Sequence, residues 1–286
     1  MHLMKKISVI TVNKNNAVGL LATAKSIVSQ TALSDLEWIV IDGGSTDGSI
    51  EVIRQFEPYI DYWVSEEDGG IYPAMNKGIC ASHGEYILFR NSGDLMFDNQ
   101  VIENFIKHPA YGRYDHCSGV TKVVSNGRLK YVFYPPSQLT MEAFYRWAMP
   151  HASTFIKRSR FEDSVYDESM KISADTVFAF ADIMARNATY APLDFVVTLF
   201  EADGISSRPD MQKVGVAERD KGFKACLSTQ LYSDITYMFR DVNSRERRLI
   251  HYTWTRTWEF KILCYAALIL SIPRRIIERI FKERKN

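Results

Sequence analysis

LEWIVIDGGSTDGSIEVIRQF, residues 36–56, is the stretch of sequence that decides the fold class. It opens with a near-continuous apolar run, which is typical of a strand buried on both faces. Asp42 and two glycines interrupt this run, and from Asp47 onward the apolar residues recur with helical spacing. The stretch therefore predicts a strand, a tight turn and a helix in direct succession.

The same alternation runs through residues 6–89. Strand-like runs at residues 6–12, 61–65 and 85–89 alternate with segments of helical spacing. This order predicts βαβ units and a mainly parallel sheet, in which ligands bind beyond the carboxyl ends of the strands. Small, polar or acidic residues stand at four such ends in turn: Asn13 and Asn15, residues 42–45, residues 65–68 and residues 91–94.

The pattern changes after the fourth predicted strand. VTKVVSNGRLKYVFY, residues 120–134, predicts an antiparallel hairpin beside the parallel sheet. Asn126 and Gly127 would provide the positive φ angles of its tight turn.

The remainder of the chain returns to helical patterns. A helix is expected within residues 171–188 and a strand within residues 189–200, after which the sequence becomes charged and helix-like. We therefore expect an α/β domain over residues 1–205 and a C-terminal helical extension over residues 206–286.

Composition narrows the class of protein. The chain has 286 residues and a formal net charge of +1, so no general attraction for nucleic acid is expected. Its four cysteines lack metal-ligand spacing and its N-terminus leads directly into a strand, which indicates reduced thiols in a cytoplasmic protein without an export segment. The absence of GxGxxG and GxxxxGK[ST] sequences argues against a dinucleotide oxidoreductase and a P-loop enzyme.

Two carboxylates at strand ends are candidate ligand contacts. Asp42 can accept hydrogen bonds from a base or a sugar, although Ser45 and Asp47 beside it also fit an ordinary helix cap. Asp94 follows a glycine turn and suits a hard divalent cation that bridges it to phosphate oxygens, because Mg²⁺ needs few protein ligands. The alternative for this turn is a cap on a helix that begins near Asp98.

A third strand end combines acidic residues with a glycine pair in SEEDGGIYPAMNKGI, residues 65–79. Asp68 and Asn76 are candidate ligand contacts because the glycines let the backbone approach a ligand closely. Lys77 could contact a diphosphate, but it could equally be an ordinary surface lysine on a helix.

Four motifs follow one another at the predicted strand ends: VITVNKN (residues 9–15), VIDGGSTDGS (40–49), SEEDGGIYPAMNKGI (65–79) and FRNSGDL (89–95). Together they resemble the family 2 inverting glycosyltransferases of the GT-A fold. Their order and spacing match most closely the subgroup that builds bacterial capsule, exopolysaccharide and colanic acid repeat units. The resemblance covers about residues 1–205 and implies a Rossmann-like, mainly parallel sheet with an added antiparallel hairpin.

The resemblance implies a donor site built from the strand ends and one later histidine. The residues that match donor-binding positions are Thr11, Asn13, Asn15, Asp42, Asp68, Asn76, Lys77, Asn91 and His151. Asp94 matches the ligand of a divalent metal, Mg²⁺ or Mn²⁺. The fullest form of the family's motif has aspartates where this chain has Asn91 and Gly93, so Asp94 is the carboxylate left to bind metal.

An inverting transfer also needs a base that takes the proton of the acceptor hydroxyl. The family places an aspartate for this at the start of a helix beyond the hairpin, and Asp175 matches that position. A carboxylate in the first turn of a helix is also favoured by the helix dipole alone. Asp167 and Glu168, which precede the same helix, are the next candidates.

The implied reaction moves a sugar from a nucleotide sugar, UDP-linked by family preference, to a saccharide acceptor in bacterial surface polysaccharide synthesis. In this subgroup the acceptor is carried on a polyprenyl diphosphate, which implies a place at the inner face of the cytoplasmic membrane. Two alternatives stay open. One is a sugar nucleotidyltransferase, and the other is a non-catalytic module that binds nucleotide sugar or glycan.

The C-terminal residues 251–286 combine Trp254, Trp258, an apolar run and a basic tail. An apolar run of about thirteen residues is too short for a bilayer span, which needs roughly twenty. The pattern predicts a helix that lies in an anionic membrane surface. The alternative is a helix packed on the α/β domain or on a second copy of the chain, which would make a homo-oligomer.

Overall fold

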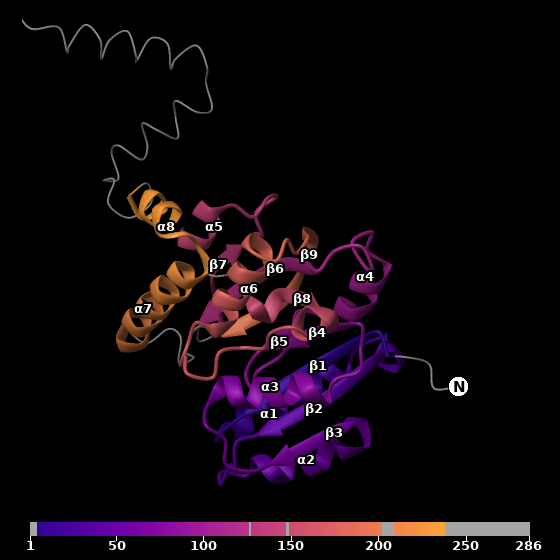
Figure 1. Ribbon diagram of the computed structural model, residues 1–286. Helices are drawn as coiled ribbons and strands as arrows, with labels where there is room; N and C mark the ends of the chain where they lie inside the picture. Colours follow the sequence, from indigo (N-terminus) through magenta and orange to yellow (C-terminus); the bar gives the residue numbers. More distant parts are fainter. Residues whose placement is uncertain (1–4, 126, 147–148, 202–208, 238–286) are drawn as a thin grey trace, which may run out of the picture. The chain divides into compact units, whose positions relative to one another are not determined.

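One mixed sheet organises the protein (Figure 1). In the computed structural model the described residues are 5–125, 127–146, 149–201 and 209–237, and nine strands of this part join the sheet. In chain order the strands are β1 (Ile7–Asn13), β2 (Leu36–Asp42), β3 (Tyr62–Ser65), β4 (Tyr86–Phe89), β5 (Leu95–Met96), β6 (His116–Ser125), β7 (Arg128–Phe133), β8 (Thr154–Lys157) and β9 (Tyr190–Glu201). Their spatial order is β3-β2-β1-β4-β8-β6-β9-β5, with β7 paired to β6.

The first four strands form the parallel part that the sequence predicts. β1 pairs in parallel with β2 and β4, and β2 pairs in parallel with β3. β6 and β7 form the predicted antiparallel hairpin, in which Gly127 has a φ of +70°. The fold is therefore α/β with a mostly parallel, curled sheet, as expected.

Helices α1 to α4 and α6 lie beside the strands of the sheet (Figure 1). The helix expected near Asp98 begins at Val101, with Gln100 as its N-cap residue, and Asp98 accepts a hydrogen bond from the backbone N–H of Gln100 at 2.8 Å just before the helix. The helices are α1 (Ala17–Val28), α2 (Ser49–Phe56), α3 (Ile71–Ala81), α4 (Val101–Lys107), α5 (Met141–Arg146), α6 (Ala174–Met184), α7 (Pro209–Cys226) and α8 (Thr229–Thr236). Short 3-10 turns are η1 (Leu33–Asp35), η2 (Glu57–Tyr59), η3 (His151–Ser153) and η4 (Arg158–Phe161).

Both faces of the sheet are buried. Because successive side chains of a strand point to opposite faces, Val9 packs in one apolar cluster and Ile10 in the other. Leu20 of α1 joins the first cluster, whereas Met75 of α3 and Phe178 of α6 join the second. This two-sided burial explains why β1 and β2 read as continuous apolar runs.

The carboxyl ends of three strands lie side by side. In the parallel register Asn13 stands opposite Asp42, and Asp42 stands opposite Ser65. α3 lies directly against β1 here, since a Cβ added at Gly78 would be only 2.4 Å from Cγ2 of Ile10. The polar strand ends predicted from the sequence are therefore brought together at one edge of the sheet.

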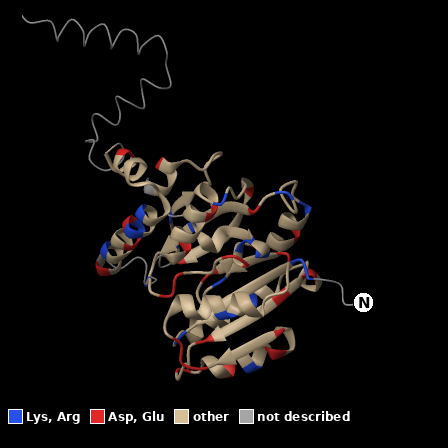
Figure 2. Cartoon of the chain, viewed as in Figure 1, with Lys and Arg blue, Asp and Glu red and all other residues tan. Residues whose placement is uncertain are grey.

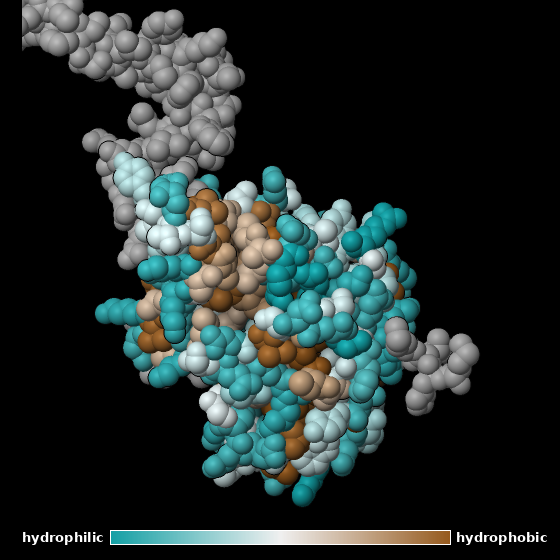
Figure 3. Space-filling view, viewed as in Figure 1, coloured by the Kyte–Doolittle hydropathy of each residue, from teal (hydrophilic) through white to brown (hydrophobic). Residues whose placement is uncertain are grey.

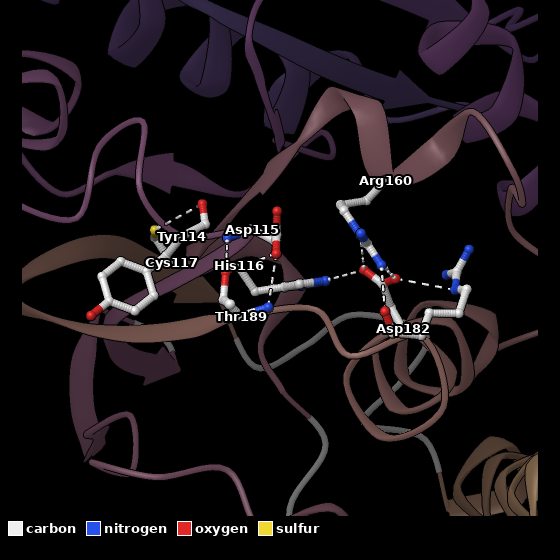
Figure 4. A network of polar contacts seen from close by, with 8 residues as sticks. Tyr114, Asp115, His116, Cys117, Arg160, Asp182 and Thr189 are labelled. Atoms are coloured by element: carbon white, nitrogen blue, oxygen red, sulfur yellow. Dashed lines mark hydrogen bonds and ion pairs between the residues drawn. The ribbon is translucent and has the colours of Figure 1, made fainter.

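A buried ion-pair network fixes α6 to the sheet (Figure 4). Asp182 of α6 is fully buried and lies between His116 of β6 and Arg160 of η4. Its carboxylate contacts His116 Nε2 at 2.6 Å and accepts three hydrogen bonds from Arg160. Arg186 adds an ion pair at 3.1 Å. The position of α6 is therefore set by charge as well as by apolar packing.

The described part of the C-terminal region is helical, as predicted. α7 packs on α6, with the rings of Phe180 and Phe223 stacked at a centroid separation of 4.0 Å. Both helices belong to the first of two compact units, Met1–Thr229 and Gln230–Asn286. The domain boundary predicted at residue 205 stays a prediction, since it falls within residues 202–208, outside the described ranges.

The visible surface has a mixed character. Acidic and basic residues are interspersed over the described chain (Figure 2). Apolar surface gathers where α5 and α6 lie in Figure 1 (Figure 3). No helix among the described residues is long and apolar enough to cross a membrane. The surface helix predicted for residues 251–286 lies outside the described residues.

Candidate active site

Asp42 is the centre of the hydrogen-bonding network at the carboxyl ends of β1, β2 and β3. Its buried carboxylate accepts hydrogen bonds from Asn13 Nδ2 at 2.7 Å, Ser45 Oγ at 2.6 Å and Ser65 Oγ at 2.6 Å. The backbone N–H groups of Gly44 and Ser45 add two more. Burial alone would raise the pKa of Asp42, but these donors outweigh it and lower the pKa. Since a carboxylate offers about four acceptor positions, these donors hold Asp42 firmly in the loop, and its role as a donor contact stays a prediction.

Asn13, the last residue of β1, and Asn15 also make hydrogen bonds to this loop. Asn13 donates to Asp42, and its buried Oδ1 has no partner among the described residues. Asn15 has a φ of +49° and accepts a hydrogen bond from the backbone N–H of Thr46 at 2.9 Å. Both residues fix the loop between β2 and α2 against the end of β1.

Like Asn13, Asn15 and Asp42, three further predicted donor contacts do not line the cleft described below. Thr11 is fully buried and accepts a hydrogen bond from Trp38 Nε1 at 3.0 Å. The Asn76 amide makes three hydrogen bonds to the segment 166–168, at 2.9, 2.9 and 3.0 Å. Lys77 forms an ion pair with Glu66. Each of these side chains is held by the protein itself, and none lines the cleft.

A cleft of about 1970 Å³ opens at the strand edge. Its walls come from the loops after β1, β3 and β4, from β7, from the start of α6 and from α7. Five of the predicted site residues line it: Asp68, Asn91, Asp94, His151 and Asp175. Large clefts with a few convergent polar groups are the usual location of ligand sites.

Asp68 and Lys14 mark the end of the cleft nearest to β1 and β2. Both side chains lie over Gly43, where an added Cβ would be 2.7 Å from Asp68 Oδ2 and 3.2 Å from Lys14 Cδ. Glycine is therefore required at position 43 for this close approach. Lys14 was not predicted, since an exposed lysine in a loop gives no signal of its own.

The turn after β4 presents Asp94 to the cleft. The Asp94 N–H donates to the carbonyl of Asn91 at 2.9 Å, and Gly93 takes a φ of +106°. Thr23 of α1 fixes the turn by donating to the Asp94 carbonyl and accepting from the Gly93 N–H, both at 2.9 Å. Burial raises the pKa of Asp94, and the positive charges of His151 and Arg90 act against this rise.

The donor set of this turn fits a hard divalent cation. Asp94 offers a carboxylate, and the buried Asn91 Oδ1 has no hydrogen-bond partner among the described residues. Oxygen ligands of this kind suit Mg²⁺ or Mn²⁺. Across the ranges that the structure describes, no three His, Cys, Asp or Glu side chains gather into a metal cluster. The ion would therefore take its other ligands from a bound diphosphate and from water.

Asp175 lies in the first turn of α6 and belongs to a polar trio. It accepts a hydrogen bond from the hydroxyl of Tyr72 at 2.9 Å and forms an ion pair with Nδ1 of His151 at 3.0 Å. Burial acts to raise the pKa of Asp175, but His151 and Tyr72 outweigh it and the pKa is lowered. Burial acts to lower the pKa of His151, but Asp175 and Asp94 raise it. The trio therefore keeps Asp175 ionised.

His151 connects this trio to the turn after β4. Its Nε2 lies 3.4 Å from Nδ2 of Asn91. Arg90, which is fully buried, holds the adjacent residue by donating to the carbonyl of Ala152. Arg90 also donates to Thr198 Oγ1 at 2.8 Å, and burial lowers its pKa to about 10. The candidate metal ligand and the candidate base thus belong to one connected site.

The loop before α6 is held by α7. The Glu218 carboxylate of α7 accepts hydrogen bonds from the backbone N–H groups of Lys171, Ile172 and Ser173 at 2.6, 3.0 and 3.1 Å. These residues directly precede the helix that carries Asp175. Sequence reasoning treated this part of the chain as an extension, and no motif linked Glu218 to a loop that is 45 residues away or more.

The fold and the cleft place the protein in a defined class. A mostly parallel sheet, an acidic turn at the end of β4 and a carboxylate at the start of a later helix define a GT-A glycosyltransferase. The sequence profile of glycosyl transferase family 2 matches residues 8–167, and the chain belongs to this family.

Similar proteins support this assignment. An uncharacterized glycosyltransferase of Mycobacterium tuberculosis is 30% identical over 217 residues, which cover 73% of this chain and 79% of the relative. The solved structure of Staphylococcus aureus TarS 1-349 in complex with UDP-GlcNAc matches with a TM-score of 0.61 and 19% identity, over 82% of this chain and 71% of that one. The mannosyltransferase PcManGT of Pyrobaculum calidifontis, in complex with GDP-Man and Mn²⁺, matches with a TM-score of 0.52 and 16% identity, over 96% and 83% of the two chains.

Membership of this family makes the protein a glycosyltransferase. The two alternatives considered from the sequence, a sugar nucleotidyltransferase and a non-catalytic binding module, are thereby set aside. The narrower resemblance to the capsule and colanic acid subgroup stays a prediction.

Proposed function

We propose that the protein transfers a sugar from a UDP-sugar to a hydroxyl group of a saccharide acceptor, with inversion at the anomeric carbon. The observation that carries this proposal is the trio of Asp175, His151 and Tyr72 in the same cleft as Asp94. Asp175 takes the proton of the acceptor hydroxyl while that oxygen attacks the anomeric carbon. His151 and Tyr72 hold the carboxylate in place and ionised for this step.

The donor lies along the strand edge. Asp68, Lys14 and Asn91 line that side of the cleft and would contact the nucleotide. Asp94 and Asn91 would hold Mg²⁺ or Mn²⁺, which neutralises the negative charge that develops on the leaving diphosphate. The complex of TarS with UDP-GlcNAc and the complex of PcManGT with GDP-Man and Mn²⁺ support a nucleotide sugar and a divalent metal.

The acceptor is a saccharide of bacterial surface polysaccharide synthesis, carried on a polyprenyl diphosphate. The motif resemblance supports this class, as does the basic, Trp-containing sequence of residues 251–286. Together they favour a cytoplasmic protein at the inner face of the cytoplasmic membrane. A homo-oligomer, the alternative use of the same C-terminal residues, stays a prediction.

A screen followed by one substitution tests the reaction. Thermal shifts with a panel of nucleotide sugars, with and without Mn²⁺, identify the donor, and release of UDP on adding saccharide acceptors measures turnover. Because Asn cannot accept the proton, Asp175→Asn should lower kcat by about 10²–10⁴-fold while the donor Kd changes little. Asp167→Asn is the matched control and should keep turnover. Loss of turnover in Asp167→Asn with near-normal Asp175→Asn would assign the base to the other aspartate.

A further inference from the structure

Cationic side chains stand at two ends of the cleft. Of the described Lys and Arg residues, Lys14, Lys171 and Arg219 line it. Lys14 follows β1 at the donor end. Lys171 precedes α6, and Arg219 belongs to α7, which lies away from β2 and β3 (Figure 1). The second pair therefore lies where α7 and the loop before α6 form the wall of the cleft.

The Arg219 guanidinium is half-buried and makes no hydrogen bond or ion pair with any described residue. The neighbouring Glu218 carboxylate does not engage it, since its oxygens accept from the backbone of residues 171–173. Burial lowers the pKa of Arg219, and the charges of Asp175 and Glu218 act against this. A partly desolvated guanidinium with five N–H donors and no acceptor is arranged for an anion from solution.

Arg219 lines the same cleft as Asp175 and Asp94. Arg219 interacts electrostatically with Asp175, the proposed base. Asp94, the proposed metal ligand, interacts instead with His151 and Arg90. Arg219 is therefore electrostatically coupled to the proposed base, beside which the acceptor hydroxyl would lie.

We propose that Arg219 binds a phosphate group of the acceptor and so places the acceptor hydroxyl beside Asp175. The planar guanidinium fork matches phosphate oxygens in a bidentate geometry, which a lysine cannot offer. Lys171 adds a second positive charge at the rim. This assignment rests on the proposed function, because it takes Asp175 as the base.

Apolar side chains beside Arg219 favour a phosphate that is joined to an apolar chain. Val216 of the same helix is 58% exposed and lines the cleft, as do Met211 and Ile172. A phosphate joined to an apolar chain, as in a prenyl diphosphate, would contact both surfaces at once. A phosphate within a saccharide or free in solution would use Arg219 alone.

Binding measurements on the full chain test the site. The probes are pyrophosphate and farnesyl diphosphate, titrated calorimetrically onto protein saturated with UDP and Mn²⁺. Loss of a charge-assisted bidentate contact should weaken both probes at least about tenfold in Arg219→Gln. The Kd of UDP should change less than about twofold in the same variant, since it occupies the donor end. Lys213→Gln, which removes an exposed charge from the same helix outside the cleft, should change neither value.

Each outcome decides a separate point. Unchanged probe affinity in Arg219→Gln, or no probe binding to the wild-type chain, overturns the site. A parallel loss of UDP affinity overturns it too, because Arg219 would then bind the donor. Farnesyl diphosphate binding tighter than pyrophosphate identifies a lipid-linked phosphate, and equal affinity identifies one without an apolar chain.

A second background separates this proposal from the proposed function. If the wild-type chain fails to bind UDP, the donor assignment fails, whereas the phosphate site can still be tested in Asp94→Ala. Pyrophosphate binding that requires Arg219 in that background supports the site by itself. Arg219→Lys, which keeps the charge and loses the fork, should recover only part of the affinity and confirms that the fold is intact.

Discussion

At Asp175 two opposing effects set the protonation state. Burial favours the neutral acid, whereas the ion pair with His151 and the Tyr72 hydrogen bond favour the carboxylate and prevail. The base form therefore persists to a pH below the ordinary carboxyl range. A low pKa also makes Asp175 a weaker base. The negative charge of a bound diphosphate would raise the pKa of Asp175, so the base would be stronger once the donor is present.

This balance predicts the pH dependence of His151→Gln. Transfer needs ionised Asp175, and loss of the His151 charge leaves burial as the larger effect, so the pKa of Asp175 rises. The acidic limb of kcat/KM should therefore move to higher pH. His83→Gln is the control, because the side chain of His83 is 77% exposed and pairs with Glu37. An acidic limb that stays in place would show that His151 does not tune the base.

The metal assignment depends on a single carboxylate. Asp94→Ala should abolish the part of UDP affinity that depends on Mn²⁺, because Asn91 alone offers only a neutral oxygen. The thermal transition should show that the variant is folded, as the Thr23 contacts to the turn use backbone atoms and remain. Asp98→Ala, an exposed carboxylate nearby, is the matched control. Undiminished Mn²⁺-dependent binding in folded Asp94→Ala would remove Asp94 from the site.

The sequence pattern predicts which residues stand at strand ends. It does not show which of their side chains line the cleft and which form hydrogen bonds to other segments of the chain. Asp94 and Asp175 line the cleft as expected, whereas Asn76 turns its amide to a segment that is 90 residues away. Tyr72 lies in the same motif and reaches Asp175, 103 residues distant. These pairings depend on how α3 packs under the loop before α6, and no local spacing encodes that packing.

Among the elements, α6 must be positioned most accurately because it carries Asp175, the proposed base. The loop that leads into it is held by Glu218 of α7, and its last turn is held by the Asp182 network. The sequence predicted the helicity of both α6 and α7. It could not predict their contact, because the stacked Phe180 and Phe223 look like ordinary core residues in either helix.

The Asp182 network should account for a large share of stability. Asp182→Ala would leave His116 and Arg160 without their buried partner, which typically costs about 3–5 kcal/mol. Urea denaturation measures the loss, and Asp163→Ala, an exposed carboxylate, should cost no more than about 0.5 kcal/mol. Equal stability of the two variants would contradict the role of the network.

The same network determines how the stability of the protein changes with pH. The hydrogen bonds of His116 and Arg160 outweigh burial and lower the pKa of Asp182. Its contribution is therefore complete above the ordinary carboxyl pKa and is lost as the pH falls through the lowered value. Asp182→Ala should lack this acid-dependent loss, so the stability gap between the wild type and this variant should narrow in acid.

At the scale of the whole molecule, the sequence predicts the part of the sheet that is built from successive βαβ units. β1 to β4 follow one another through crossover helices, and the alternation of patterns reveals this. β9 was predicted as a strand, yet its place between β6 and β5 was not, because that pairing joins distant segments. This placement matters for the site, since Val197 and Thr198 of β9 hold the buried Arg90.

The last prediction concerns the C-terminal residues 251–286, which lie outside the described ranges. If they lie on an anionic membrane, a chain that ends at residue 250 should lose its binding to anionic vesicles in a sedimentation assay. High salt should weaken binding of the full chain, because the Debye length falls to about 3 Å at 1 M.

A second variant separates charge from apolar contact. Each basic residue near such a surface contributes about 1 kcal/mol, so replacing Arg274, Arg275 and Arg279 by Gln should weaken binding by roughly a hundredfold while the apolar run is kept. Partial binding by this variant, intermediate between the full and shortened chains, is what an interfacial helix requires. A full chain that ignores anionic vesicles at low salt would favour packing on protein, and an equilibrium sedimentation run would then show whether the partner is a second copy.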